Sequence, residues 1–382
     1  MSRIGDLLVE FKEKPRSSDE PPVLTLTERN GFVRQTERFN KRLATEDVSN
    51  YKIVRRNDIA FNPYLLWAGA VAQNTIVDEG IISPLYPTFR VREGHDPRFV
   101  ARLLLTPQLI NEYDGIAFGS VPRRRRSSVQ DFLGLRLDRV PPLREQQRIA
   151  AILDRADAIR FKRRQVLDQL DALPQAIFHG MFEKEPPTAT VVDVATRVRT
   201  GPFGSQLLHG EFVDDGVAVL GLDNVVGNEF RWAERRYITP AKYEQLKRYT
   251  VSPGDVLISI MGTTGRCVVV PAGIPTAINT KHICAITVDS GRINPEFLRA
   301  AFLWHPASRD HLRRQTKGSI MDGLNMGIIK AMPIPVPTLA RQEEFADRLR
   351  ALGQRHTATR SALAAGDELF AALQSRAFRG EL

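Results

Sequence analysis

Few residues in this sequence have the types and spacing that catalysis requires. The turn Gly262-Thr-Thr-Gly265-Arg266 resembles part of a phosphate-binding loop, but the complete motif, which ends in Gly-Lys-Ser or Gly-Lys-Thr, is absent. Ser205 does not stand in the GxSxG context of a hydrolase nucleophile. The acidic pair Asp214-Asp215 is typical of a solvated turn, and the seven histidines contain no HExxH motif. We therefore expect no catalytic residue, no bound cofactor and no metal site in this chain.

One further segment invites a catalytic interpretation. Phe61-Asn62-Pro63-Tyr64 resembles the Asn-Pro-Pro-Tyr sequence with which amino-methyltransferases hold a flipped base. It lacks one proline, however, and no Gly-rich cofactor loop that follows a strand precedes it. We interpret the segment as a turn at the end of a strand.

The remaining candidates for binding are basic loops. A run of four arginines follows Gly119-Ser-Val-Pro122, and a second basic cluster precedes Gly318-Ser319. Loops on a rigid scaffold are where binding residues concentrate, although a solvated surface run stays an alternative for each cluster. The predicted DNA contacts are Arg123, Arg124, Arg125, Arg126, Arg266, Arg313, Arg314 and Lys317.

Composition points to an anionic partner inside the cell. The 382 residues include 54 Lys and Arg against 44 Asp and Glu, a net charge of +10. Such an excess favours a polyanion, most commonly nucleic acid. Two cysteines, Cys267 and Cys284, make a disulfide framework improbable, and no signal sequence or apolar membrane span is evident. We expect a soluble, cytoplasmic protein of two or three domains.

The sequence contains an internal repeat. Val140-Pro-Pro-Leu-Arg-Glu-Gln-Gln147 recurs as Val336-Pro-Thr-Leu-Ala-Arg-Gln-Glu343, and Asp96-Pro-Arg-Phe-Val100 recurs as Asn294-Pro-Glu-Phe-Leu298. Three weaker matches follow in the same order at nearly the same offset, about 197 residues. A repeat of this length indicates a duplicated domain. The predicted boundaries are residues 1–140 and 190–335 for two mixed α/β domains, each followed by a helical segment, 141–189 and 336–382.

Charge follows the same division. Residues 1–140 carry 22 basic and 18 acidic side chains, and residues 190–335 carry 17 and 13, so each domain has a net charge of +4. Two positive modules joined by nearly neutral helices suggest two contacts on one polyanion.

Each helical segment carries apolar residues at alternating steps of three and four over about four heptads, which is typical of a coiled coil. The alternative is two surface helices, each packed on its own domain. A helix of about 38 residues would be roughly 57 Å long. The predicted interface residues are Ile149, Ile152, Ile159, Val166, Leu170, Leu173, Phe345, Leu349, Leu352, Leu363, Phe370 and Leu373.

These features together resemble the specificity (S) subunits of type I restriction–modification systems. The resemblance covers the whole chain and is strongest where Val140–Ile149 leads into a helix that ends Ala-Ile-Phe178, and at Phe378-Arg-Gly-Glu-Leu382. Phe61–Ala70 with Ser83-Pro84, and the turns Gly262–Gly265 and Gly318-Ser319, are similar to parts of the family's recognition domains.

The resemblance implies a mixed α+β fold with two target-recognition domains, joined by two long helices that form an antiparallel coiled coil with pseudo-twofold symmetry. It implies that the chain reads an asymmetric, bipartite site in double-stranded DNA and has no catalytic residues. The expected partners are two modification subunits, adenine methyltransferases that use S-adenosylmethionine, and restriction subunits that use ATP and Mg. Two alternatives stay open: a stand-alone DNA methyltransferase, and a scaffold that does not bind DNA.

Overall fold

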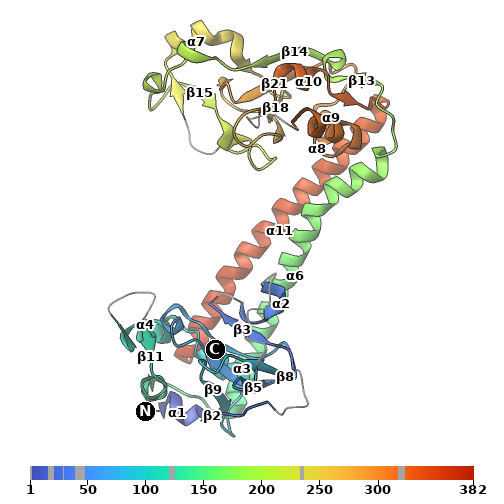
Figure 1. The fold of residues 1–382 in the computed structure, drawn as a ribbon. Helices are drawn as coiled ribbons and strands as arrows, with labels where there is room; N and C mark the ends of the chain where they lie inside the picture. The colour runs from blue at the N-terminus through green and yellow to red at the C-terminus, as the bar shows by residue number, and fades with distance from the viewer. Residues whose placement is uncertain are drawn as a thin grey trace. The chain divides into compact units, whose positions relative to one another are not determined.

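The computed structural model describes residues 2–15, 21–28, 30–38, 48–119, 125–232, 236–316 and 323–382. The chain divides into two compact units: unit 1 is Met1–Arg164 with Ser361–Leu382, and unit 2 is Gln165–Arg360. Each unit is a mixed α/β body that includes part of both long helices (Figure 1). Among the described residues, no helix is both long and apolar enough to cross a membrane.

Unit 1 is built around an antiparallel four-stranded sheet whose order is β2-β9-β6-β7. These strands are β2 (Leu8–Phe11), β9 (Thr88–Val91), β6 (Ile59–Phe61) and β7 (Val71–Gln73). Four strand pairs surround it: β1 (Ser2–Arg3) with β12 (Arg136–Leu137), β3 (Leu24–Thr27) with β4 (Gly31–Arg34), β5 (Lys52–Arg55) with β8 (Glu79–Ile82), and β10 (Ala117–Phe118) with β11 (Arg126–Ser127). The short helices are α1 (Ile4–Leu7), α2 (Gln35–Arg38), α3 (Pro97–Leu103), α4 (Pro107–Gly115) and α5 (Val129–Gly134).

Unit 2 repeats this plan. Its central sheet has the order β14-β21-β18-β19, from β14 (Ala195–Thr200), β21 (Ile283–Val288), β18 (Val256–Ser259) and β19 (Cys267–Val269). A second sheet holds β16 (Tyr237–Ile238), β15 (Val217–Leu220), β20 (Ala277–Asn279) and β17 (Thr250–Val251), and β13 (Ala189–Thr190) pairs with β22 (Pro333–Ile334). The helices are α7 (Pro240–Leu246), α8 (Pro295–Trp304), α9 (Pro306–Thr316) and α10 (Met326–Lys330). The predicted duplication is therefore confirmed at the level of topology.

One turn shows how closely the two units agree despite different sequences. Asp58 accepts a hydrogen bond from the Arg55 amide at 2.7 Å, and Asp255 accepts one from the Ser252 amide at 2.9 Å. The residue before each aspartate has a left-handed backbone, with φ of 74° at Asn57 and 86° at Gly254. Asn and Gly are the residues that tolerate this conformation, so different residue types build the same turn.

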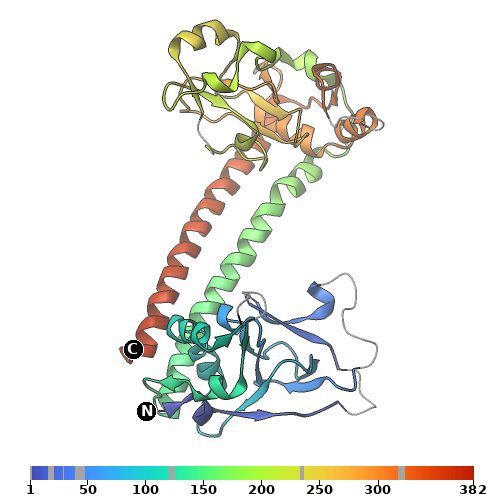
Figure 2. The ribbon, with the colours of Figure 1, turned by 60° about the vertical axis from the view of Figure 1, so that its left-hand side comes forward.

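The two long helices are α6 (Leu143–Phe182) and α11 (Leu339–Arg379), and they lie side by side in antiparallel directions (Figure 2). They contact each other in both units, which excludes the alternative in which each helix packs only on its own domain. In unit 1, Arg160 pairs with Asp367 at 2.6 Å. In unit 2, His356 lies 3.1 Å from Asp171. Helix α6 also continues past Pro174 to Phe182.

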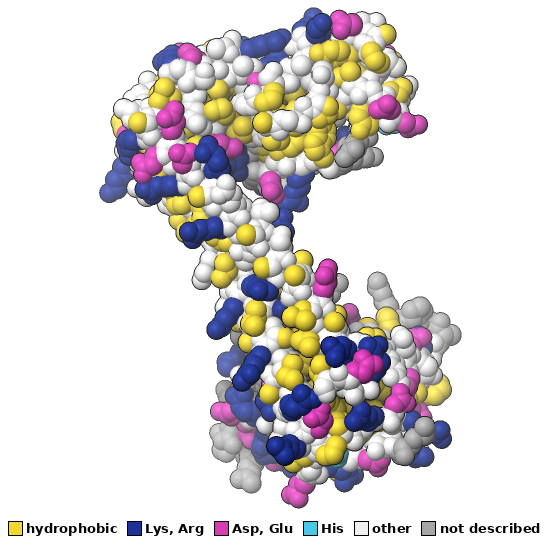
Figure 3. All heavy atoms as spheres, turned by 180° about the vertical axis from the view of Figure 1, so that it is seen from behind, with side chains coloured by type: hydrophobic (Ala, Val, Ile, Leu, Met, Phe, Trp, Pro, Cys, Tyr) yellow, Lys and Arg dark blue, Asp and Glu magenta, His cyan; other side chains and the backbone are white. Residues whose placement is uncertain are grey.

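The packed face of α11 contains the predicted positions. Phe345 is fully buried, and the other five predicted residues are half-buried: Leu349, Leu352, Leu363, Phe370 and Leu373. On α6 the structure differs from the prediction. Ile149 is buried and Ile152 and Leu170 are half-buried, but Ile159, Val166 and Leu173 are exposed. Figure 3 shows apolar side chains at the surface along the helices.

The packed face of α6 is shifted by about one residue from the predicted positions. It includes Leu153, Arg160 and Leu167, which are buried or half-buried. The physical reason is that arginine can fill a packing position. The Arg160 guanidinium lies 4.3 Å from the centre of the Phe370 ring, and its alkyl stem covers apolar surface. A prediction that accepts only apolar residues at packed positions chooses Ile159 over Arg160. It therefore assigns the wrong face of α6 to the interface.

Arg163, a charged residue on the packed side of α6, also fits against α11. Arg163 donates to the carbonyl oxygen of Ala362 at 2.6 Å. A Cβ atom at Gly366 would lie 2.9 Å from the Arg163 guanidinium, so the glycine leaves the space that this arginine occupies.

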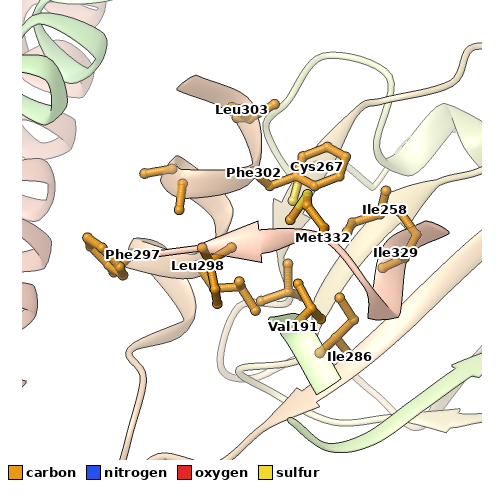
Figure 4. Close-up of a cluster of buried hydrophobic side chains, with 14 of the residues drawn as sticks. Val191, Ile258, Cys267, Ile286, Phe297, Leu298, Phe302, Leu303, Ile329 and Met332 are labelled. Carbon is orange, nitrogen blue, oxygen red and sulfur yellow. The ribbon is translucent and has the colours of Figure 1, made fainter. Parts of the chain in front are cut away.

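Each long helix is anchored at its ends in the hydrophobic core of a unit. In unit 2, Phe178 and Phe182 of α6 and Phe345 of α11 lie in one buried cluster with Phe297. Figure 4 shows part of this cluster, with Phe297 and Leu298 among the labelled residues of α8. In unit 1, the ring of Phe378 near the end of α11 lies 5.4 Å from that of Phe99 on α3.

A buried glutamine fixes the start of each long helix in the same way. In unit 1, Gln146 accepts from the Asp96 amide at 3.0 Å and donates to the Pro141 carbonyl at 2.8 Å. In unit 2, Gln342 accepts from the Asn294 amide at 2.7 Å and donates to the Pro337 carbonyl at 2.8 Å. Asp96 and Asn294 are the N-cap residues of α3 and α8, so each glutamine ties a long helix to its own domain.

Replacing Gln146 with alanine leaves two backbone groups without their partner in a buried place, at about 1–3 kcal/mol each. We expect Gln146→Ala to lower the free energy of unfolding of unit 1 by about 2–4 kcal/mol. Amide hydrogen exchange in α3, which resolves one unit from the other, is the measurement. The matched control is Gln147→Ala, which removes an exposed neighbour and should change stability by less than about 0.5 kcal/mol. Equal effects of the two substitutions would contradict the anchoring role.

Candidate nucleic-acid interface

In unit 2, several loops leave the central sheet at one edge. Thr200, the last residue of β14, pairs with Cys284, and Ser259, the last residue of β18, pairs with Ile283. Ile258 in turn pairs with Cys267, the first residue of β19. The segments Gly201–Gly204, Met261–Arg266 and Thr280–His282 therefore meet along this line, which we call the unit 2 edge.

The unit 2 edge presents two cations and two apolar side chains. Arg266 and Lys281 are exposed, and among the described residues neither forms an ion pair. Phe203 and Met261 are exposed to 48% and 37%. Burial, and then the charge of Lys281, lowers the pKa of His282 below its ordinary value, so this imidazole is neutral at pH 7. Cations beside an exposed aromatic ring and an exposed thioether suit a ligand with phosphates and stacked bases.

The loops of this edge are held rigidly. A Cβ atom at Gly201 would lie 2.1 Å from the Asn279 carbonyl oxygen, so only glycine fits where the Phe203 loop crosses the end of β20. The Ser259 hydroxyl donates to the Thr263 carbonyl at 2.5 Å and accepts from the Arg266 amide at 2.9 Å, which closes the turn that carries Arg266. Side chains on such loops have fixed positions, as base readout requires.

Unit 1 has a corresponding edge. Ala60 on β6 pairs with Thr88, the first residue of β9, so the segments 62–70 and 83–87 leave the sheet together; we call this the unit 1 edge. The Ser127 amide donates to the Pro63 carbonyl at 2.9 Å and holds β11 against it. The exposed Arg126 lies 5.9 Å from the centre of the Tyr64 ring. An arginine beside a tyrosine is again a suitable partner for phosphates and bases.

The predicted contact residues have different surroundings. Arg126 and Arg266 lie at the two edges. Arg125 instead pairs with Asp114 at 2.6 Å and donates to the Ala117 carbonyl, so it holds its own hairpin. Arg313 and Arg314 are exposed near the end of α9, and Arg313 pairs with Asp310 at 2.5 Å. Arg123, Arg124 and Lys317 lie outside the described residues.

Asn62, which we considered for catalysis, and the two buried cysteines have structural surroundings that do not suit catalysis. The Asn62 side chain accepts from the Tyr64 amide at 3.0 Å, which supports the interpretation of this segment as a turn. Burial raises the pKa of both thiols, that of Cys284 to about 12, so neither is a nucleophile at neutral pH. Within the described parts of the chain, no group of three or more His, Cys, Asp or Glu residues could hold a metal ion.

Sequence reasoning missed Tyr64, Phe203, Met261 and Lys281 as members of the edges. The glycines on both sides of Pro202-Phe203 were a usable signal, because they mark a turn that displays the residue between them. No local pattern indicated that Lys281 lies along the same edge as Arg266, since strand pairing brings them together.

Comparison with known proteins agrees with this architecture. Residues 226–364 match the family model described as type I restriction modification DNA specificity domain. Over 177 residues, 45% of this chain, the sequence is 27% identical to the type I restriction enzyme EcoBI specificity subunit of Escherichia coli. The match spans 37% of the length of that protein.

Two solved structures share the fold over nearly the whole chain. One comes from a study of complex assembly and conformational transition of the type I R-M system; it is 16% identical, covers 100% of this chain and 97% of that chain, and gives a TM-score of 0.59. The other is the type I restriction-modification system S subunit from M. genitalium, at 14% identity, coverage of 98% and 95%, and a TM-score of 0.56. The family model and the curated relative agree with the resemblance that the sequence shows: residues 226–364 are similar to the DNA specificity domain of type I restriction–modification systems, and the solved structures share the fold.

Proposed function

We propose that this chain reads an asymmetric, bipartite site in double-stranded DNA, and that each unit reads one part with its edge. The observation that carries the proposal is the pairing of one topology with two different sets of side chains. Each edge stands at the corresponding end of the central sheet of its own unit, and both edges present exposed cations. Their remaining side chains differ: Tyr64 and Trp67 in unit 1, against Phe203 and Met261 in unit 2. Two edges with different side chains on a repeated scaffold suit two half-sites of different sequence.

The contacts divide by their chemistry. Arginine and lysine side chains neutralise phosphates and place the protein on the duplex without reading its sequence. Arginine can also read guanine with two hydrogen bonds, and aromatic rings can stack on bases. Arg126, Arg266 and Lys281 supply the first kind of contact, and the aromatic residues beside them supply the second.

The chemistry in such a system belongs to other subunits. We propose that this chain is a non-catalytic part of its enzyme, as specificity subunits are; the similarity of residues 226–364 to a DNA specificity domain supports this role over the stand-alone methyltransferase that we considered from the sequence. We propose two modification subunits, adenine methyltransferases that use S-adenosylmethionine, as the partners of this chain. Restriction subunits that use ATP and Mg would join the same complex.

The decisive experiment maps methylated adenines. We expect the purified chain to methylate no DNA by itself and, together with its modification subunits, to direct methylation to one two-part motif. Sequencing of methylated bases in cells with and without this chain is the measurement. The scaffold alternative predicts instead that methylation of the motif persists without the chain, or that the assembled complex does not bind DNA.

A change at Arg266 should alter the salt dependence of binding. Each phosphate contact contributes about 0.9 to the slope of log affinity against log salt concentration. We expect Arg266→Ala in the assembled complex to reduce this slope by about 1, as measured by DNA titration at several salt concentrations. Arg355→Ala is the control, because Arg355 is also exposed but lies on α11 away from the edge. A slope equal to that of the control would remove Arg266 from the DNA interface.

A change at Phe203 should alter the affinity for DNA but not the salt dependence of binding. Loss of a stacked aromatic ring weakens binding by about 1–3 kcal/mol per base without changing the number of phosphate contacts. We expect Phe203→Ala to lower affinity at every salt concentration and to leave the slope unchanged. Val192→Ala is the matched control, since Val192 is exposed to 49%, against 48% for Phe203, but precedes the opposite end of β14. Affinity equal to that of the control would show that the Phe203 ring makes no contact.

A further inference from the structure

Unit 1 contains a cavity that the proposed DNA contacts do not use. Its volume is about 310 Å³, and it lies between the start of α4, strand β12 and the last turns of α11. Its floor is apolar and consists of Leu103, Leu109, Leu137 and Phe378. A volume of this size accommodates one or two side chains of a bound segment.

The rim of the cavity is positively charged. Arg136, Arg139 and Arg379 line it together with one acid, Asp138, which accepts a hydrogen bond from Gln108 at 2.9 Å. Arg379 pairs with Glu381 at 2.8 Å, and Arg139 donates to the Gly380 carbonyl at 3.4 Å. Arg136 is exposed and, as far as the structure is described, forms no ion pair. The rim is therefore complementary to a carboxylate.

The internal repeat identifies the surface of unit 2 that corresponds to the cavity of unit 1. His305 precedes α9 as Thr106 precedes α4, and Ile334 in β22 stands where Leu137 stands in β12. Phe178 contacts Phe297 of α8 as Phe378 contacts Phe99 of α3. These pairs relate the lining of the cavity to a surface of unit 2.

In unit 2 this surface is covered by residues 183–188, Glu-Lys-Glu-Pro-Pro-Thr. A ring nitrogen of His305 lies 3.1 Å from the Glu185 carbonyl oxygen, and the Thr188 amide donates to the Ile334 carbonyl at 3.1 Å. The Glu185 carboxylate pairs with Arg341. The covering segment is thus acidic and proline-rich; it begins with a turn at residues 183–184, and an arginine holds its Glu185 carboxylate.

We propose that the cavity of unit 1 takes an acidic, proline-containing segment of a partner polypeptide, which follows the path that residues 183–188 take in unit 2 but is held by other arginines, because Glu145 stands where Arg341 stands. The carboxylate pairs with Arg136 and Arg139, and an apolar side chain enters the floor between Leu109 and Phe378. A proline-containing segment suits the site because it is already extended and loses little conformational entropy on binding. This inference concerns a protein contact and does not depend on DNA recognition.

The test uses a fluorescent peptide that copies residues 182–188, titrated into the full chain. We expect saturable binding that Ala371→Trp weakens by about tenfold or more, because Ala371 is exposed on α11 and lines the cavity, so the indole fills it. The control is Ala372→Trp, which places the same side chain at the next position, also exposed but outside the lining. Absence of saturable binding, or equal binding by the two variants, would overturn the proposal.

A second pair of variants tests the charge. We expect Arg136→Glu to weaken peptide binding by about tenfold or more, and Arg144→Glu, at an exposed arginine outside the lining, to leave it unchanged. A peptide with both glutamates replaced by glutamine should also bind more weakly. Equal binding of the acidic and neutral peptides would show that the rim does not select a carboxylate. The titration contains neither DNA nor modification subunits, so its outcome is separate from that of the methylation experiment.

Discussion

The structure of each unit depends on the burial of the first turns of a long helix against the body of that unit, which consists of its sheets and short helices. A single glutamine makes this attachment polar and specific: Gln146 and Gln342 are exposed to 1% and 0%, and each bonds a backbone amide and a backbone carbonyl. Around each glutamine the apolar residues of the helix continue the core of the body, so that helix and body form one packed unit. Buried backbone groups must find partners, and the glutamine satisfies two of them with one side chain.

This attachment fixes the edge of each sheet relative to the helix that starts beside it. The sheet, the helix N-cap and the glutamine are linked by short contacts, whereas the loops at the edge carry the side chains that differ between the units. Glycines at places of close approach, such as Gly201, keep those loops in one conformation. In the function that we propose, this repeated scaffold with exchangeable loops would let a single fold read two unrelated sequences, because base contacts depend on the loop side chains and not on the sheet.

The contact between the two long helices is more polar than an ideal heptad interface. Arg160 stacks on Phe370 and pairs with Asp367, and Arg163 takes the space left by Gly366. Such contacts are specific to one register, because an arginine displaced by one turn would lose its carboxylate and meet a side chain instead of a glycine. The apolar residues left over, Ile159, Val166 and Leu173, are exposed on α6.

The sequence by itself determined the duplication and the two long helices, because these follow from local spacing and from motifs that repeat at a constant offset. It also located Arg266 in a loop, whereas Arg126, which we expected in a loop, is the first residue of β11. Only the tertiary structure decided which face of α6 packs, since a heptad pattern treats arginine as a solvent-facing residue and cannot foresee its stacking on Phe370. The same holds for the edges: Phe203, Arg266 and Lys281 are separated by more than sixty and by fifteen positions in the chain, and strand pairing alone brings them to one side of a sheet.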